Sequence, residues 1–194
     1  MPKIVDHDEQ RLHLSATVAD VVAEFGLENT TLRTVAARHG CTKGMVQHYF
    51  ADKDELLLAA LKFIEDQCDA RLPEVGSDAM ASLQALFTAQ LPLNDALVDE
   101  WRVRLAFVTL ARQSGAVAGV LAERQAQRQS AGLRLLRQAQ KSKELKKGLS
   151  PLNAYRSLYC LAYGLGVGAA AGDSQWSPAV QRGMLKAAVA DLRP

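Results

Sequence analysis

The sequence has few cysteines, and their number and spacing argue against two common kinds of site. Cys41, Cys68 and Cys160 form no CxxC pair, and three thiols cannot all be paired within one chain. Neither a disulfide framework nor a zinc site is therefore expected. We predict three free, buried thiols in a reducing compartment.

Long apolar runs are also missing. No stretch approaches the roughly 20 apolar residues that a membrane-spanning helix needs. The opening residues, MPKIVDHDEQ, are charged and hold no apolar segment of the kind found in signal peptides. We expect no membrane partner and a cytoplasmic location.

The signatures of common enzymes are missing as well. The four histidines, His7, His13, His39 and His48, show no HExxH or other metal-ligand spacing, and there is no P-loop or nucleophile elbow. The Gly-x-Gly-x-Gly run at 164–168 lies inside a predicted helix and follows no strand. We predict no catalytic residue, metal or cofactor, and a helical enzyme is the less favoured alternative.

The net charge of +2, from 23 basic and 21 acidic residues, does not by itself indicate a nucleic-acid partner. Residues 1–60 even hold six Lys and Arg against nine Asp and Glu. The placement of charge is more informative, because 29–53 contains one acidic residue, Asp52, and four basic ones. These four are Arg33, Arg38, Lys43 and Lys53. Positive charge is thus concentrated in this short segment.

What the sequence does contain is a helical pattern from end to end, with Gly and Pro as punctuation and no convincing alternating strand. Thr31, Ser150 and Ser177 are good N-caps, and Pro follows the last two directly. We predict an all-α fold of about nine helices. Their approximate ranges are 9–25, 32–39, 42–49, 52–71, 77–91, 95–113, 116–147, 151–171 and 178–192.

Residues 30–53 have the layout of a helix-turn-helix: a helix, a tight turn at Gly40 and a second, very short helix. Apolar side chains at Val35, Val46 and Phe50 fall at spacings that point into one small core. The remaining positions of the second helix then face outward and supply a cation, an amide, an imidazole and a phenol. Such a mixture can contact phosphates and base edges in DNA.

Thr42–Phe50, followed by Asp52–Leu56, resembles the DNA-binding module of the TetR family of transcriptional regulators. The resemblance implies a DNA-binding domain at 8–55, with its recognition helix at 42–49, and an effector-binding and dimerisation domain at 56–194. It also implies a homodimer that represses transcription on double-stranded operator DNA and is released by a small-molecule effector. The DNA-contacting positions that it implies are Thr31, Arg33, Thr42, Lys43, Gly44, Met45, Gln47, His48, Tyr49 and Lys53.

Several of these positions have an alternative interpretation. Gln47 departs from the family, in which many members carry Tyr there, so the operator sequence cannot be transferred from relatives. Arg33 and Lys53 are also compatible with ordinary surface residues, and Tyr49 with a core residue. The acidic character of residues 1–28 fits a second possibility, a protein that keeps the fold and binds a small molecule without binding DNA.

The C-terminal part is similar to the BetI-type branch, whose namesakes respond to choline, in the segments Trp101–Phe107 and Leu158–Gly166. Aromatic side chains can hold a quaternary ammonium ion by cation–π contact. The candidate effector-binding residues are Trp101, Arg104, Phe107, Tyr155 and Tyr159. The aromatic residues are equally compatible with core packing. Arg104 needs a carboxylate or an anionic ligand if it is buried, or it reaches the surface by its long stem.

In the family, the last two helices form a four-helix bundle across a two-fold axis, and here Gly164, Gly166 and Gly168 would permit close helix packing. The candidate interface residues are Leu158, Leu161, Leu165, Met184, Leu185 and Val189. A dimer also suits DNA, because two recognition helices then reach major grooves about 34–36 Å, or a multiple of that distance, apart. The alternative is that these residues pack within one chain.

Overall fold

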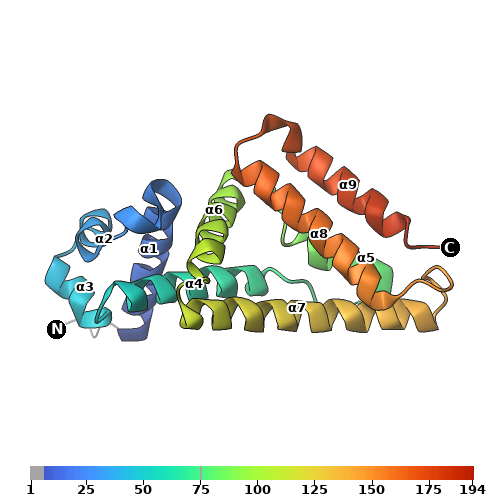
Figure 1. Ribbon diagram of the computed structural model, residues 1–194, viewed down its shortest axis with the longest axis horizontal. Coiled ribbons are helices and arrows are strands. Elements are labelled where there is room, and N and C mark those ends of the chain that lie inside the picture. Colours follow the sequence, from blue (N-terminus) through green and yellow to red (C-terminus); the bar gives the residue numbers. More distant parts are fainter. Residues whose placement is uncertain (1–6, 75) are drawn as a thin grey trace, which may run out of the picture. The chain divides into compact units, whose positions relative to one another are not determined.

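The computed structural model describes residues 7–74 and 76–194, and this part of the chain contains helices and no strand. The predicted all-α fold class is confirmed, and Figure 1 shows the helices in chain order. The elements are α1 (His7–Asn29), α2 (Leu32–His39), α3 (Lys43–Tyr49), α4 (Lys53–Ala70), α5 (Ala79–Thr88), α6 (Asp95–Leu110), α7 (Gly115–Lys141), α8 (Pro151–Ala170), the 3-10 turn η1 (Ser174–Trp176) and α9 (Pro178–Ala190).

The chain divides into two compact units, each with its own hydrophobic core. The first unit consists of Met1–Gln67 and Arg102–Leu121, and the second of Cys68–Trp101 and Ala122–Pro194. The chain passes from one unit to the other inside α4, α6 and α7, so these three helices contribute residues to both.

The core of the first unit is built from the apolar faces of α1 to α4 and from part of α6 and α7. Its largest fully buried side chains include Phe50, Leu56 and Phe107. The sequence predicts that the first helix ends at residue 25; in the structure α1 is interrupted at Gly26, with φ 76° and ψ 171°, and then continues to Asn29. Glycine adopts positive φ at little cost, which explains why the helix is interrupted at this residue.

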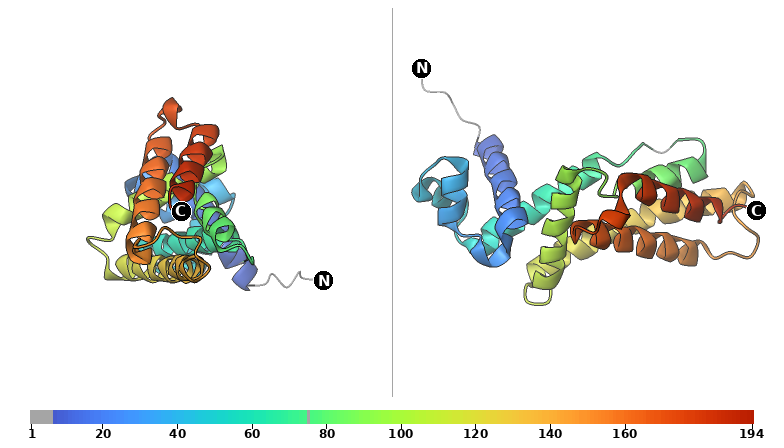
Figure 2. Two further views of the ribbon diagram at one scale, coloured as in Figure 1. Left: turned by 90° about the vertical axis from the view of Figure 1, so that its right-hand side faces the viewer. Right: turned by 90° about the horizontal axis from the view of Figure 1, so that it is seen from above.

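The core of the second unit lies among α5, α8, α9 and the C-terminal part of α7. Leu83, Leu136, Leu158 and Leu185 are almost completely buried there. Helices α8 and α9 lie side by side in Figures 1 and 2, and both contact α5. Within one chain, each of these helices therefore covers the apolar face of the others.

The predicted helix over 116–147 is too long, because α7 ends at Lys141. Lys143 has φ 62°, and the amides of Glu144 and Leu145 both donate to the Ala139 carbonyl, at 2.8 and 3.2 Å. Leu145 is buried in the core of the second unit. The basic run is therefore a turn that closes the helix and is anchored by a leucine.

The prediction of three buried thiols is wrong for two of them. All three cysteines are free, but only Cys68 is buried, whereas Cys41 is half-buried and Cys160 is exposed. Cys160 is exposed because it lies on the face of α8 opposite to Leu158 and Leu165, which point into the core.

Candidate nucleic-acid interface

The helix-turn-helix is fixed by local hydrogen bonds that its own sequence supplies. Thr31 caps α2, because its hydroxyl accepts from the Thr34 amide at 3.1 Å while the Thr34 hydroxyl accepts from the Thr31 amide at 2.8 Å. Gly40 ends α2 in the left-handed conformation, with φ 75° and ψ 30°. Thr42 then caps α3, its hydroxyl accepting from the Met45 amide at 3.2 Å. The predicted cap at Thr31 and the predicted turn at Gly40 are confirmed.

The recognition helix α3 presents one polar face and one buried face. Lys43 and Gln47 are one helical turn apart, as are Gly44 and His48, so the four share a face, and all are exposed. Val46 points the other way and is completely buried. Of the ten predicted DNA-contacting residues, seven are exposed and three are half-buried. The exposed ones are Thr31, Arg33, Thr42, Lys43, Gly44, Gln47 and His48, and the half-buried ones are Met45, Tyr49 and Lys53.

Tyr49 lies at the boundary between the core of the first unit and the surface. It is half-buried against the core of the first unit. Its ring also lies 4.6 Å from that of His7 and 5.2 Å from that of His48, measured between ring centroids. The ring is therefore held by its neighbours at the end of the recognition helix, with part of it accessible.

Lys53 is held in place by a backbone contact. Its ammonium donates to the Glu28 carbonyl at 3.0 Å, which ties the start of α4 to the end of α1. Glu28 is three residues before Thr31, so the bond ties Lys53 to a residue close in sequence to Thr31, another of the predicted DNA-contacting residues. Lys53 is thus not a lysine without a partner.

Sequence reasoning missed Arg11, which contacts the recognition helix from α1. Its guanidinium donates to the Tyr49 carbonyl at 2.5 Å and to a Glu55 carboxylate oxygen at 2.8 Å. Asp52 caps α4, because its carboxylate accepts from the Glu55 amide at 2.8 Å, whereas Glu55 accepts in return from the Ala51 amide, at 2.8 Å, and not from Asp52. No local spacing in the sequence signals the two Arg11 contacts, since they join residues 38 and 44 positions apart.

The five candidate effector-binding residues do not gather in one unit. Trp101, Tyr155 and Tyr159 belong to the second unit, and Arg104 and Phe107 to the first. Phe107 is completely buried in the first unit's core. Arg104 does not reach the surface, because its Nε donates to a Glu65 carboxylate oxygen at 3.1 Å and its side chain is only 11% exposed. Of the two alternatives, the buried one with a carboxylate partner is therefore correct.

Aromatic rings in the second unit form a continuous row. The Tyr155 and Tyr159 rings stack at 6.3 Å, Tyr159 lies 5.9 Å from Tyr163, and Tyr163 lies 5.7 Å from Trp101. The Trp101 indole N–H donates to the Gln90 carbonyl at 2.8 Å, which fixes the ring. Tyr163 was not among the predicted residues, although it follows Tyr159 by one helical turn.

The titration of Tyr155 provides a test of its burial. Burial raises its pKa to about 12, and the hydrogen bond from Gln125 offsets only part of that shift. The folded-state pKa exceeds the unfolded value of about 10, so the stability that this group contributes is complete below about pH 10 and is lost as the pH rises towards 12.

We expect the ultraviolet phenolate band of the wild type, minus that of Tyr155→Phe, to appear with a midpoint near pH 12. A difference band with its midpoint at the ordinary tyrosine value of about 10 would contradict the buried position.

Four of the six candidate interface residues are buried within one chain. Leu158, Leu165, Leu185 and Val189 are each at most 3% exposed and belong to the second unit's core. Leu161 is half-buried and Met184 is 39% exposed. Apart from alanine and proline, the apolar residues that α8 and α9 leave on the surface are instead Cys160, Val167, Val180 and Met184.

Two known protein families match this chain, one in its N-terminal part and the other in its C-terminal part. Residues 15–60 match the description "Bacterial regulatory proteins, tetR family", and residues 79–194 match "BetI-type transcriptional repressor, C-terminal". The second match alone covers more than half of the chain. The chain belongs to the TetR family. The C-terminal match also confirms the resemblance to the BetI-type branch, and both descriptions are of regulators and not of enzymes.

Individual relatives agree with this assignment. The TetR-family chain is 30% identical over 115 residues to the HTH-type transcriptional regulator PksA of Bacillus subtilis, a match that covers 58% of this chain and 56% of PksA. It therefore spans about half the length of this curated relative. A transcriptional regulator from Rhodococcus is 29% identical, with a TM-score of 0.82 over 94% of each chain. A regulator from Saccharomonospora viridis, solved with choline, has the same TM-score at 23% identity and covers 93% of this chain and 95% of that one, which shows the shared fold.

Metal-binding clusters and membrane-spanning helices are both absent from the described residues of this TetR-family chain. No three His, Cys, Asp or Glu side chains in residues 7–74 and 76–194 gather in a way that would hold a metal ion. None of the helices in the same part of the chain is long and apolar enough to cross a membrane.

Proposed function

We propose that this protein is a sequence-specific DNA-binding repressor that is released from its operator by a small molecule. The observation that carries the proposal is the doubly capped helix-turn-helix, whose second helix exposes Lys43, Gly44, Gln47 and His48 on one face. These side chains have the chemistry to contact phosphates and base edges. In this proposal residues 8–55 bind DNA in the cytoplasm, and residues 56–194 bind the effector and form the dimer.

The proposed dimer brings two recognition helices to successive major grooves. Its contact surface would be the outer faces of α8 and α9, with Cys160, Val167, Val180 and Met184, because the inner faces are already covered within one chain. Gly164, exposed on the same side of α8 as Cys160, leaves room for a helix of the second copy. Size measurement in solution, by light scattering, tests this part: a monomer at micromolar concentration would refute it.

The proposed effector binds in the BetI-type C-terminal domain, where Tyr155, Tyr159, Tyr163 and Trp101 form the aromatic row. A quaternary ammonium ion is the class that such rings favour by cation–π contact, and the choline complex of the Saccharomonospora regulator points to the same class. Release follows if the effector prefers a conformation with low operator affinity, by as much as its affinities for the two conformations differ.

The deciding experiment measures the binding of the purified protein to the intergenic DNA beside its own gene, by fluorescence anisotropy at several salt concentrations. We expect tight binding that weakens steeply with salt, because phosphate contacts release counterions. Addition of choline is expected to weaken this binding. If the protein binds neither this DNA nor any duplex in a genome-wide screen, it keeps the fold without DNA binding.

Lys53 is expected to contribute a phosphate contact without sequence preference. The ammonium is already held at the end of α1 by its bond to Glu28. Lys53→Ala is therefore expected to weaken binding to all duplexes by a similar factor and to reduce the slope of log K against log salt by about 1. Lys62→Ala, which removes a cation further along α4, provides the control. An unchanged slope in Lys53→Ala would contradict the assignment.

A further inference from the structure

We propose that Arg11 is the positioning residue that holds the recognition helix α3 on the first turn of α4. Arg11 is on α1, outside the helix-turn-helix, and it is not expected to touch DNA. The proposal rests on the proposed function only in that one of its two readouts is operator binding.

The geometry consists of three contacts from a single guanidinium. One nitrogen donates to the Tyr49 carbonyl at 2.5 Å, and a second donates to Glu55 at 2.8 Å. The central carbon lies 4.7 Å from the centre of the Phe50 ring. Arg11 therefore contacts the end of α3, the residue that follows it and the first turn of α4 at the same time.

The Tyr49 contact satisfies a group that the helix itself cannot. Tyr49 is the last residue of α3, and the final carbonyls of a helix have no amide partner within it. Phe50 turns away in an extended conformation, with φ −136°. The position of the helix end is therefore defined by a donor from another element, and Arg11 is that donor.

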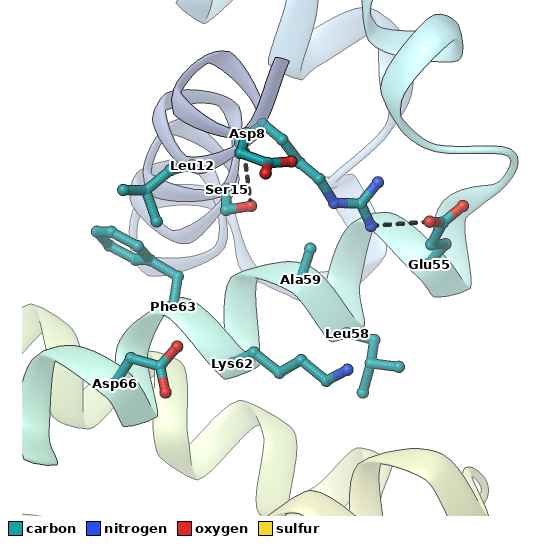
Figure 3. A pocket seen from close by; sticks show the side chains of 10 residues that line it. Asp8, Leu12, Ser15, Glu55, Leu58, Ala59, Lys62, Phe63 and Asp66 are labelled. Carbon is teal, nitrogen blue, oxygen red and sulfur yellow. Dashed lines mark hydrogen bonds and ion pairs between the residues drawn. The ribbon is translucent and has the colours of Figure 1, made fainter. Parts of the chain in front are cut away.

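The Glu55 contact is equally well defined. One carboxylate oxygen accepts from Arg11 and the other from the Ala51 amide at 2.8 Å, while the Glu55 amide donates to Asp52. The bond from Ala51, and then that from Arg11, lowers the pKa of Glu55. Figure 3 draws the ion pair as a dashed line that ends on Glu55, at the wall of a cavity of about 420 Å³ between α1 and α4.

A lysine cannot replace this arrangement. A guanidinium is planar and has five donors in a rigid fork, whereas an ammonium is a compact charge on a flexible stem. Lysine at position 11 would keep the charge, but its single nitrogen cannot occupy the two separate donor positions from which Arg11 bonds to the Tyr49 carbonyl and to Glu55. The connection from the first turn of α4 through Arg11 to the end of α3 would then be broken.

The first test compares operator binding by Arg11→Lys with that by wild type, on the intergenic duplex and on a random duplex of equal length. We expect about a tenfold loss on the operator, the size typical of a bond to a charged group, and a change of less than about twofold on the random duplex, because the outward cations remain. Glu55→Gln is expected to add no further loss to Arg11→Lys, since both break the same link. The matched control is Lys62→Arg, the reverse exchange at another residue lining the cavity.

The second test needs no DNA. Hydrogen–deuterium exchange is expected to be faster in Arg11→Lys than in wild type over α3 and the first turn of α4, and unchanged over α2 and α8. Wild-type exchange over α3, or wild-type operator affinity in a folded Arg11→Lys protein, would overturn the proposal. If the wild type binds no DNA, the proposed function fails, and the exchange experiment still decides the role of Arg11.

Discussion

Replacement of Gly166 by alanine is expected to destabilise the second unit by about 1–3 kcal/mol or more, the usual range for overpacking a core. Gly166 is buried in α8, and a Cβ there would overlap the six-membered part of the Trp101 indole. The indole cannot easily move away, because its N–H donates to the Gln90 carbonyl. Denaturant unfolding of the purified proteins measures the change.

Gly119→Ala is the matched control for this substitution. Gly119 is also inside a helix, α7, but it is exposed and a Cβ there meets nothing within 4 Å. Alanine is expected to stabilise this position by about 0.8–1 kcal/mol through its higher helix propensity. Trp101→Phe, which removes the overlapping part of the ring, is expected to recover part of the loss in Gly166→Ala. Equal stability of the two alanine variants would mean that the indole does not lie on Gly166.

Gln47→Ala is expected to abolish discrimination at one base pair of each operator half-site. Gln47 is exposed on the outward face of α3, one turn from Lys43. Its amide can pair with the N6 and N7 positions of adenine, a contact that contributes about 1–3 kcal/mol of discrimination. In a dimer the loss occurs twice. Anisotropy titrations against a set of duplexes, each with one base pair replaced, locate the position.

The pattern of the loss separates base recognition from general weakening. For Gln47→Ala we expect the wild-type preference to disappear at one position per half-site and to persist at all others. Lys53→Ala supplies the contrast, since it is expected to weaken every duplex alike. Uniform weakening by Gln47→Ala would show that this side chain contributes no sequence information.

Features determined by neighbouring residues could be predicted from the sequence. The caps at Thr31 and Thr42 and the left-handed Gly40 depend on bonds within a few positions, so the helix-turn-helix and its outward face followed from local chemistry. The end of α7 was missed because it depends on Leu145, whose burial is a property of the assembled core. An apolar residue in a basic run gives no local sign of its partner.

Features that depend on contacts between distant residues were left undecided or were predicted wrongly from the sequence. Arg104 pairs with Glu65, which lies 39 positions earlier in the chain, and neither residue marks the other by spacing. On α8, leucines occur on more than one side, and only the packing against α5 and α9 decides that Leu158 and Leu165 point inward. The prediction of interface residues rests on hydrophobicity, which does not distinguish the two faces of such a helix.

The position of Trp101 gives the protein a built-in optical reporter. The chain contains two tryptophans, Trp101 and Trp176, and both lie in the second unit. The Tyr163 ring, 5.7 Å from the Trp101 indole, is close enough to pass its excitation to it. Tryptophan emission therefore senses the environment of the second unit, and no tryptophan lies in the recognition helix. Without any label, it allows candidate small molecules to be titrated separately from DNA.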